Sequence, residues 1–343
     1  MSAKAKYRII QVLQRMNLIR MILREYMPKF IDLQDDLIQT CITVLLKDKT
    51  TKRNIMFATD SYAYMGESYS ADREITIPLL APLDLKPRIL KSQEEQAVRT
   101  RKKAEVFTPS WLCCKMNNHL DDEWFGTKDV FNRMDGEKWT ATETPVVFPE
   151  GKNWKQYVDS RRLEITCGEA PYVVSRYDTS TGSLIDIKHR IGILDRKLRV
   201  VNENTQDRDD WFKWTLRAFQ SVYGYEWQGD SLLIARMNLL LTFMEYYKDR
   251  WEYNPTDKKL YSMVMQISNV ISWNFWQMDG LTGTVPYKAP AEKKEEARQL
   301  SFSDMGWGDE IMIETKKDAG RLECILFDWR SRVPVRYNSM KKG

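Results

Sequence analysis

The sequence predicts an α/β fold, in which an open sheet with helices on both faces follows a helical region at the N-terminus. Two observations support this prediction. Apolar residues recur at three-and-four spacing over residues 7–48, which is typical of amphipathic helices. From about residue 100, short strand-like runs alternate with helical ones, as in an open α/β sheet. The 343 residues are enough to bury a large core, and we expect two regions, residues 1–98 and 99–343.

The first region is predicted to be helical and then irregular. Pro28 ends the first helical pattern, and residues 33–46 form a second amphipathic one. Residues 49–92 contain Gly66 and three prolines, so we expect an irregular, partly stranded connector there.

The second region is predicted to contain four strands and one strong helix. The helical pattern covers residues 230–247, and a charged stretch over residues 286–306 is expected to form a surface loop. The strand-like runs are residues 162–166, 221–226, 269–275 and 322–329.

Composition narrows the class of protein. Hydrophobic residues make up 43% and charged residues 29%, which is ordinary for a globular protein. The net charge of +5 permits a polyanionic partner without requiring one. Twelve Trp and sixteen Tyr suit either stacking on bases or an aromatic core. The apolar runs are too short to span a membrane, no signal-peptide pattern occurs, and the five scattered cysteines form no CxxC pair. We therefore expect a cytoplasmic protein with no membrane association and no metal site.

Residues 105–109 carry the first chemical motif. Phe107, Thr108 and Pro109 supply an aromatic wall, a hydroxyl and a fixed turn ahead of a helical pattern that contains Leu112 and Met116. Such groups suit one end of a small ligand. The alternative is a helix start, with Thr108 at the N-cap and Pro109 in the first helical position.

A second motif follows the predicted strand at residues 162–166. Cys167 and Gly168 form a small-residue turn in which backbone amides can approach a cofactor, and Glu164 can bind its amine. Ala170 stands where a second glycine is usual in such loops. A purely structural turn is the alternative.

Two further segments complete the set. Glu226 ends the strand at residues 221–226, where a carboxylate can accept both hydroxyls of a ribose. Residues 271–279 place Asn274 and Asp279 beside aromatic residues, so either can accept an adenine amine with Phe275 or Trp276 against the ring. Packing of the aromatic residues in a core is the alternative.

In this order the segments resemble the S-adenosylmethionine-dependent DNA adenine-N6 methyltransferases, over roughly residues 99–329. The closest similarity is to methyltransferase subunits of restriction-modification or phage-defence systems. The resemblance implies a methyltransferase-like (Rossmann-like) sheet, DNA as partner and S-adenosylmethionine as cofactor. It assigns cofactor contacts to Phe107, Thr108, Pro109, Glu164, Cys167, Gly168, Glu226 and Asn274.

The catalytic signature of that family departs from its usual form. Family members carry (Asn/Asp/Ser)-Pro-Pro-(Tyr/Phe) after the next strand, whereas this chain has Asp328-Trp329 and neither proline. The resemblance assigns Asp328 to the adenine amine and Trp329 to stacking on the flipped-out base. Three explanations stay open: a divergent enzyme, a site completed by a partner protein subunit that also reads DNA, or a catalytically inactive module that binds cofactor or nucleic acid in a larger assembly.

An unrelated metal-dependent nuclease or hydrolase is a third class of function. It would need clustered acidic groups near lysine, for which the sequence offers Glu310, Glu314, Lys316 and Lys317. A charged loop has the same appearance.

Overall fold

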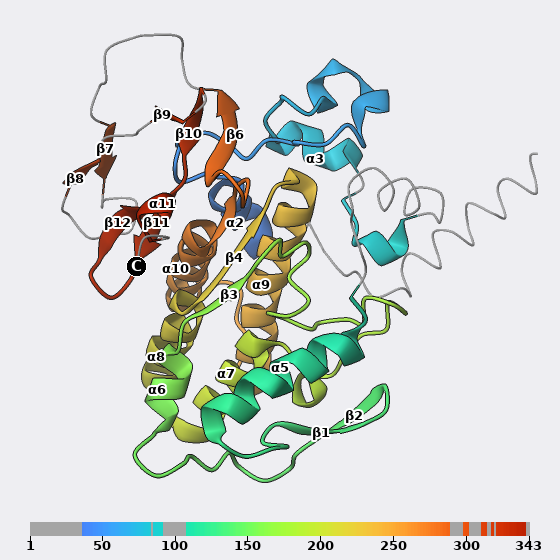
Figure 1. Cartoon of the computed structure of the whole chain (residues 1–343), viewed down its shortest axis with the longest axis vertical. Helices are drawn as coiled ribbons and strands as arrows, with labels where there is room; N and C mark the ends of the chain where they lie inside the picture. The colour runs from blue at the N-terminus through green and yellow to red at the C-terminus, as the bar shows by residue number, and fades with distance from the viewer. Residues whose placement is uncertain are drawn as a thin grey trace, which may run out of the picture.

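The computed structural model describes residues 36–83, 85–91, 108–288, 298–301, 310–313, 317–318 and 320–340 (Figure 1). The predicted helical pattern before residue 36 lies outside these ranges. Helix α2 (Asp36–Leu45) covers most of the second predicted helix. In the part of the chain that is described, no helix combines the length and the apolar character needed to cross a membrane.

A parallel sheet of three strands lies at the centre of the described chain. Its strands are β3 (Arg162–Glu164), β4 (Val222–Glu226) and β5 (Phe275–Gln277), and they pair in that order. Parallel neighbours need long connections. Here these are α7 (Ile193–Asn204) and α8 (Arg208–Gln220) between β3 and β4, then α9 (Gly229–Arg250) and α10 (Lys258–Asn274) between β4 and β5.

The other helical elements flank this unit. They are η1 (Ala63–Met65), η2 (Glu67–Tyr69), α3 (Ile77–Leu83), η3 (Arg88–Leu90), α5 (Ser110–Phe125), α6 (Trp154–Asp159), η4 (Ile187–His189) and α11 (Tyr337–Met340). The short elements and isolated bridges over residues 47–91 agree with the predicted irregular connector.

The remaining strands form small antiparallel sheets. They are β1 (Asn132–Asp135) with β2 (Lys138–Ala141), β6 (Thr284–Lys288) with β10 (Arg321–Glu323) and β9 (Lys317–Asp318), β7 (Arg298–Ser301) with β8 (Glu310–Ile313), and β11 (Ile325–Asp328) with β12 (Val333–Arg336). The described chain is therefore a mixed α/β structure with several small sheets. These ranges do not contain the single open sheet that the sequence predicts.

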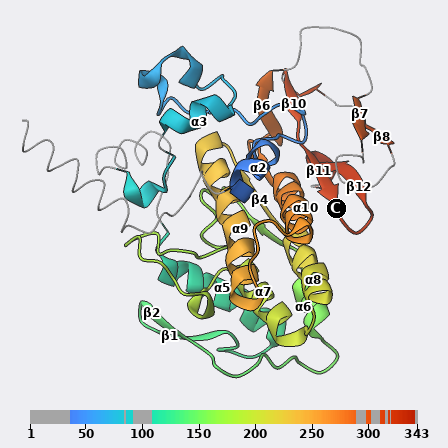
Figure 2. The same cartoon turned by 180° about the vertical axis from the view of Figure 1, so that it is seen from behind.

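Alternate residues of the parallel strands face two different cores, as strand geometry requires. Val222 and Phe275 belong to the main core with residues of α8, α9 and α10. Figure 2 shows α9 and α10 in front of β4, on this face. Tyr225 and Trp276 belong to a second cluster with Val285 of β6 and with residues of β10 and β11. Both faces of the sheet are thus covered, one by helices and the other by the antiparallel strands.

Two predicted strands are wrong in their bounds. Residues 269–274 end α10, and only Phe275–Gln277 form β5. Leu260, Val264, Ile267 and Ile271 recur at helical spacing and are all buried, so this periodicity outweighs the β-branched and aromatic composition. The predicted strand at residues 322–329 is divided at residue 324 into β10 and β11.

Candidate functional site

A cavity of about 610 Å³ opens at the carboxyl ends of β3 and β4. Open α/β sheets bind their ligands at this edge, just beyond the strand ends. The residues around it come from the loop after β3, from the start of α9 and from the short helix η3. It includes five of the predicted cofactor contacts, namely Thr108, Glu164, Cys167, Gly168 and Glu226.

The loop after β3 has an unusual backbone. Thr166, Gly168 and Ala170 have φ of 49°, 54° and 65°, all in the left-handed region. This conformation costs a residue with a Cβ atom about 1–2 kcal/mol. The Cys167 amide donates to the Tyr225 carbonyl at 2.8 Å, which extends the pairing of β3 with β4 into the loop. A glycine at position 170, which is usual in such loops, would adopt this conformation without that cost. Ala170 adopts it with the strain of its Cβ atom.

Glu226 joins this loop to the end of β4. Its Oε2 accepts from the Gly168 amide at 2.9 Å, and its Oε1 accepts from the amides of Trp227 at 2.7 Å and Gln228 at 3.0 Å. Burial raises the pKa of Glu226, although these amide donors act in the opposite direction. A carboxylate offers about four acceptor positions, so about one remains for a ligand. Glu226 thus holds the loop after β3 to the end of β4, and it is also a candidate contact for a ribose.

Of the carboxylates that line this cavity, Glu164 has the most unused capacity to accept hydrogen bonds. Its Oε2 is buried and has no hydrogen-bond partner among the described residues. Burial raises the pKa of Glu164 well above its ordinary value, and the neighbouring charge of Glu226 raises it further. A buried carboxylate without a cation is costly, and a cationic ligand group beside it would remove that cost.

Glu169 is a cavity residue that the sequence did not single out. Its Oε1 accepts from the Arg88 amide at 2.6 Å, and its Oε2 accepts from the Tyr177 hydroxyl at 2.7 Å. The Asn238 amide group donates to the Tyr177 oxygen at 3.0 Å and to the Glu169 carbonyl at 3.1 Å. Arg176 donates to Asn238 at 3.1 Å, so α9 supports the loop through a continuous network. The one sequence signal that could have indicated this network is Asn238, which follows Glu226 on the next helical pattern.

Of the described residues of the first motif, Thr108 lines the cavity and Pro109 does not. The Thr108 carbonyl accepts from the Thr179 hydroxyl at 2.7 Å, and Thr108 borders the cavity. Pro109 is the N-cap residue of α5 and is not one of the residues that line the cavity. Phe107 lies outside the described residues. The alternative of a helix start is therefore correct to within one position.

Asn274 does not reach this cavity. It is fully buried at the end of α10, where its Nδ2 donates to the carbonyls of Phe219 at 3.0 Å and Val222 at 2.9 Å. Its Oδ1 accepts from the Trp329 indole at 2.7 Å. Since Asn274 precedes β5 and Val222 begins β4, this group lies at the amino edge of the sheet. The structure therefore does not place Asn274 at this cavity, because α10 continues to residue 274, and its predicted cofactor contact stays a prediction.

Asp328 and Trp329 also lie at the amino edge. Asp328 accepts from Arg161, the residue before β3, at 2.9 Å, and from Ser331 at 2.8 Å. Burial alone would raise the pKa of Asp328, but the hydrogen bonds from Ser331 and Arg330 and the charge of Arg161 hold it below its ordinary value. The structure therefore does not bring the two predicted catalytic residues to the cavity at the carboxyl ends of β3 and β4.

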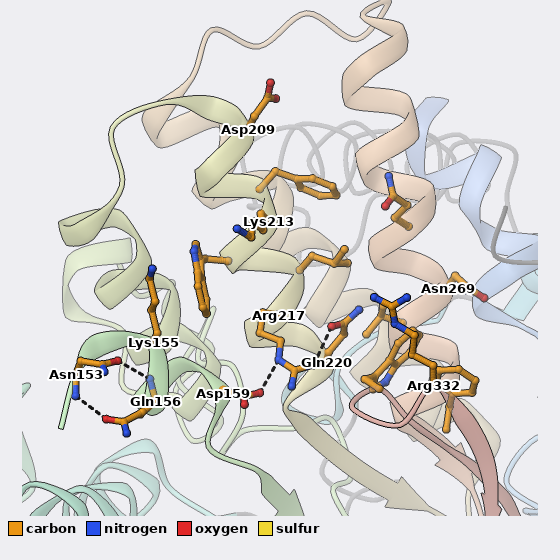
Figure 3. Close-up of a pocket in the computed structure, with 17 residues that line it drawn as sticks. Asn153, Lys155, Gln156, Asp159, Asp209, Lys213, Arg217, Gln220, Asn269 and Arg332 are labelled. Carbon is orange, nitrogen blue, oxygen red and sulfur yellow. Dashed lines mark hydrogen bonds and ion pairs between the residues drawn. The ribbon is translucent and has the colours of Figure 1, made fainter. Parts of the chain in front are cut away.

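A second cavity, of about 820 Å³, lies between α6, α8, α10 and the β11–β12 hairpin (Figure 3). Trp329 is one of the residues that line it. The two cavities are at opposite edges of the parallel sheet.

The residues considered for a metal-dependent hydrolase are not assembled into a site in the described chain. Glu310 belongs to β8 and Lys317 to β9, whereas Glu314 and Lys316 lie outside the described residues. Within the described ranges, no group of three or more His, Cys, Asp or Glu side chains is placed to hold a metal ion.

Comparison of the chain with protein-family models, with curated proteins and with solved structures found no match.

Proposed function

We propose that this chain is a DNA adenine-N6 methyltransferase-type protein of a restriction-modification or phage-defence system, and that it binds S-adenosylmethionine in the cavity at the carboxyl ends of β3 and β4. One observation carries the proposal. Residues from three separate segments of the sequence, Thr108, the loop from Glu164 to Gly168, and Glu226, line one cavity. We further propose that the three parallel strands belong to a methyltransferase-like sheet and that the protein acts in the cytoplasm.

The chemistry of the cavity suits this cofactor. Its volume of about 610 Å³ is within the usual range for sites of small molecules and cofactors. S-adenosylmethionine supplies an activated methyl group together with a cationic sulfonium and an ammonium. Glu164 offers a buried carboxylate oxygen for a cation, and Glu226 retains acceptor capacity for a ribose hydroxyl. These are the residues that would hold the cofactor.

A second candidate function has support of its own. Asp328 and Trp329 are at the opposite edge of the sheet, so the residues predicted to bind the adenine are not beside the cavity. This favours a cofactor-binding subunit that is inactive alone and that receives its base-binding groups from a partner protein.

Two measurements on the purified full chain test the proposal. Isothermal titration with S-adenosylmethionine is expected to show one binding site, which Glu164→Gln weakens at least tenfold. Incubation with unmethylated DNA and the cofactor, followed by digestion and mass spectrometry, measures N6-methyladenine. Binding with product supports the enzyme, binding without product supports the inactive subunit, and no binding by folded protein refutes both.

A further inference from the structure

The cavity at the amino edge of the sheet has aromatic walls. Phe212 and Trp214 of α8 line it, and so do Phe327 and Trp329 of the β11–β12 hairpin. Trp214 and Trp329 are both half-buried, so part of each ring is accessible. Aromatic surface of this kind offers contact to flat, unsaturated rings.

Basic side chains surround the aromatic surface. Lys155 of α6 and Lys213 of α8 are exposed, and their ammonium groups lie 5.2 Å and 5.8 Å from the Trp214 ring centroid. Neither lysine forms an ion pair with an acidic residue of the described chain. Arg217 and Arg332 also line the cavity.

The two acidic residues of this cavity are already paired. Asp159 accepts from Arg217 at 2.5 Å and from Arg330 at 3.0 Å (Figure 3 shows the first of these pairs). Asp209 pairs with Lys259. The charge offered to a ligand is therefore positive, which is complementary to an anion.

Amide side chains add hydrogen-bonding groups. Gln220 of α8 and Gln266 and Asn269 of α10 line the same cavity. Amide groups pair with the edges of nucleobases, aromatic rings stack on their faces, and lysine contacts phosphate. An acidic peptide would use the positive charge, but it would leave the combination of rings and amides without a specific role.

We infer that this cavity binds single-stranded nucleic acid, with bases against Trp214 and Trp329 and phosphates beside Lys155 and Lys213. Duplex DNA would present stacked, paired bases that cannot enter between these walls. The inference does not rest on the cofactor cavity, which lies at the other edge of the sheet. It adds a site that holds a strand away from the proposed place of methyl transfer.

The charges predict a defined salt dependence. Each phosphate contact on a single strand contributes about −0.7 to the slope of log affinity against log salt concentration. Lys155 and Lys213 together thus contribute about −1.4, which is about a sevenfold loss of affinity between 50 and 200 mM salt. Loss of one stacked base is expected to lower affinity about tenfold with no change of slope.

Fluorescence anisotropy with a fluorescein-labelled fifteen-nucleotide oligothymidine tests the inference on the full chain without added cofactor. Lys155→Glu with Lys213→Glu should weaken binding and reduce the size of the salt slope by at least about 1.4. Trp214→Leu should weaken binding while the slope stays that of the unmodified chain. The control is Lys138→Glu with Lys188→Glu, which makes the same charge change at exposed positions outside the cavity and should bind as the unmodified chain does.

Three outcomes would overturn the inference. The unmodified chain does not bind the oligonucleotide, or the cavity and control variants weaken binding equally, or poly-glutamate competes as well as the unlabelled oligonucleotide does. The last outcome would indicate an acidic protein segment as the occupant. Because cofactor titration of the same variants should be unchanged, failure here is distinguishable from failure of the proposed function.

Discussion

Substitution of Glu245 by glutamine tests the contribution of its two arginine ion pairs to the network that supports the loop after β3. Glu245 of α9 accepts from Arg176 at 2.6 Å through Oε1 and from Arg190 at 2.6 Å through Oε2. Both arginine side chains are only 6% exposed. Arg190 Nη1 already has no hydrogen-bond partner among the described residues. Glu245 is therefore the carboxylate that both guanidinium groups share, in addition to the bonds from Arg176 to Asn238 and from Arg190 to the Ile185 carbonyl.

The expected loss of stability follows from the hydrogen bonds that a glutamine at position 245 can and cannot form. The amide oxygen can still accept from Arg176, but the amide nitrogen would meet a donor of Arg190. Removing one partner of a fully buried ion pair costs about 3–5 kcal/mol. Glu245 keeps 30% of its side-chain exposure, so water recovers part of this cost. We expect Glu245→Gln to lower the free energy of unfolding by about 2 kcal/mol at neutral pH.

The effect has a defined pH dependence. Burial alone would raise the pKa of Glu245, but hydrogen bonds and charges from Arg176 and Arg190 hold it below its ordinary value. A lowered pKa in the folded state means that the stabilisation is present above the pKa of the unfolded chain and is lost as pH falls towards the folded value. The difference between Glu245→Gln and the unmodified protein should therefore shrink below about pH 4.

Urea unfolding followed by tryptophan fluorescence at pH 7 and pH 3.5 measures both quantities. Glu252→Gln is the control, since Glu252 is an exposed acidic residue just beyond the end of the same helix, and it should change stability by less than about 0.5 kcal/mol. The reasoning is refuted if Glu245→Gln has no larger effect than the control, or if its effect is the same at both pH values.

Three other predictions follow from single contacts. A Cβ atom at Gly229 would lie 1.9 Å from the Met56 carbonyl oxygen, so Gly229→Ala should cost about 3 kcal/mol or more and reduce the yield of folded protein; a normal thermal midpoint would contradict this. Asp328→Ala breaks a partly exposed pair with Arg161, so it should cost about 1 kcal/mol or less in urea and leave cofactor titration unchanged. Because burial raises the pKa of Glu164, affinity for S-adenosylmethionine should increase with pH as this carboxyl ionises, and Glu164→Gln should remove that dependence; a pH-independent affinity of the unmodified chain would be against it.

The elements around the cavity at the carboxyl ends of β3 and β4 were predictable because their sequence signals are local. A strand that ends in Glu226 and a small-residue turn after Glu164 depend on neighbouring residues only. Their meeting also follows from general rules, since the carboxyl ends of adjacent parallel strands share one edge of a sheet. The left-handed conformation of Ala170 was visible in advance only as a departure from glycine.

The misplaced residues depend on long-range packing. Asn274 was assigned to a strand because β-branched and aromatic residues precede it, whereas burial on α10 extends the helix to that position. Asp328 lies in a strand as predicted, but that strand, β11, pairs with β12 and lies beside the start of β3. No local pattern shows that this strand is absent from the parallel sheet. The network of Glu169, Tyr177 and Asn238 likewise joins segments that are far apart in sequence.

The most direct test of the central claim is to locate bound cofactor on the chain. Ultraviolet crosslinking with methyl-tritiated S-adenosylmethionine, followed by proteolysis and sequencing of the labelled peptides, identifies the segment in contact. We predict label in residues 163–172, which contain the loop after β3, and loss of label when unlabelled S-adenosylhomocysteine competes. Label confined to segments that do not border this cavity, or no specific label on folded protein, would contradict the account.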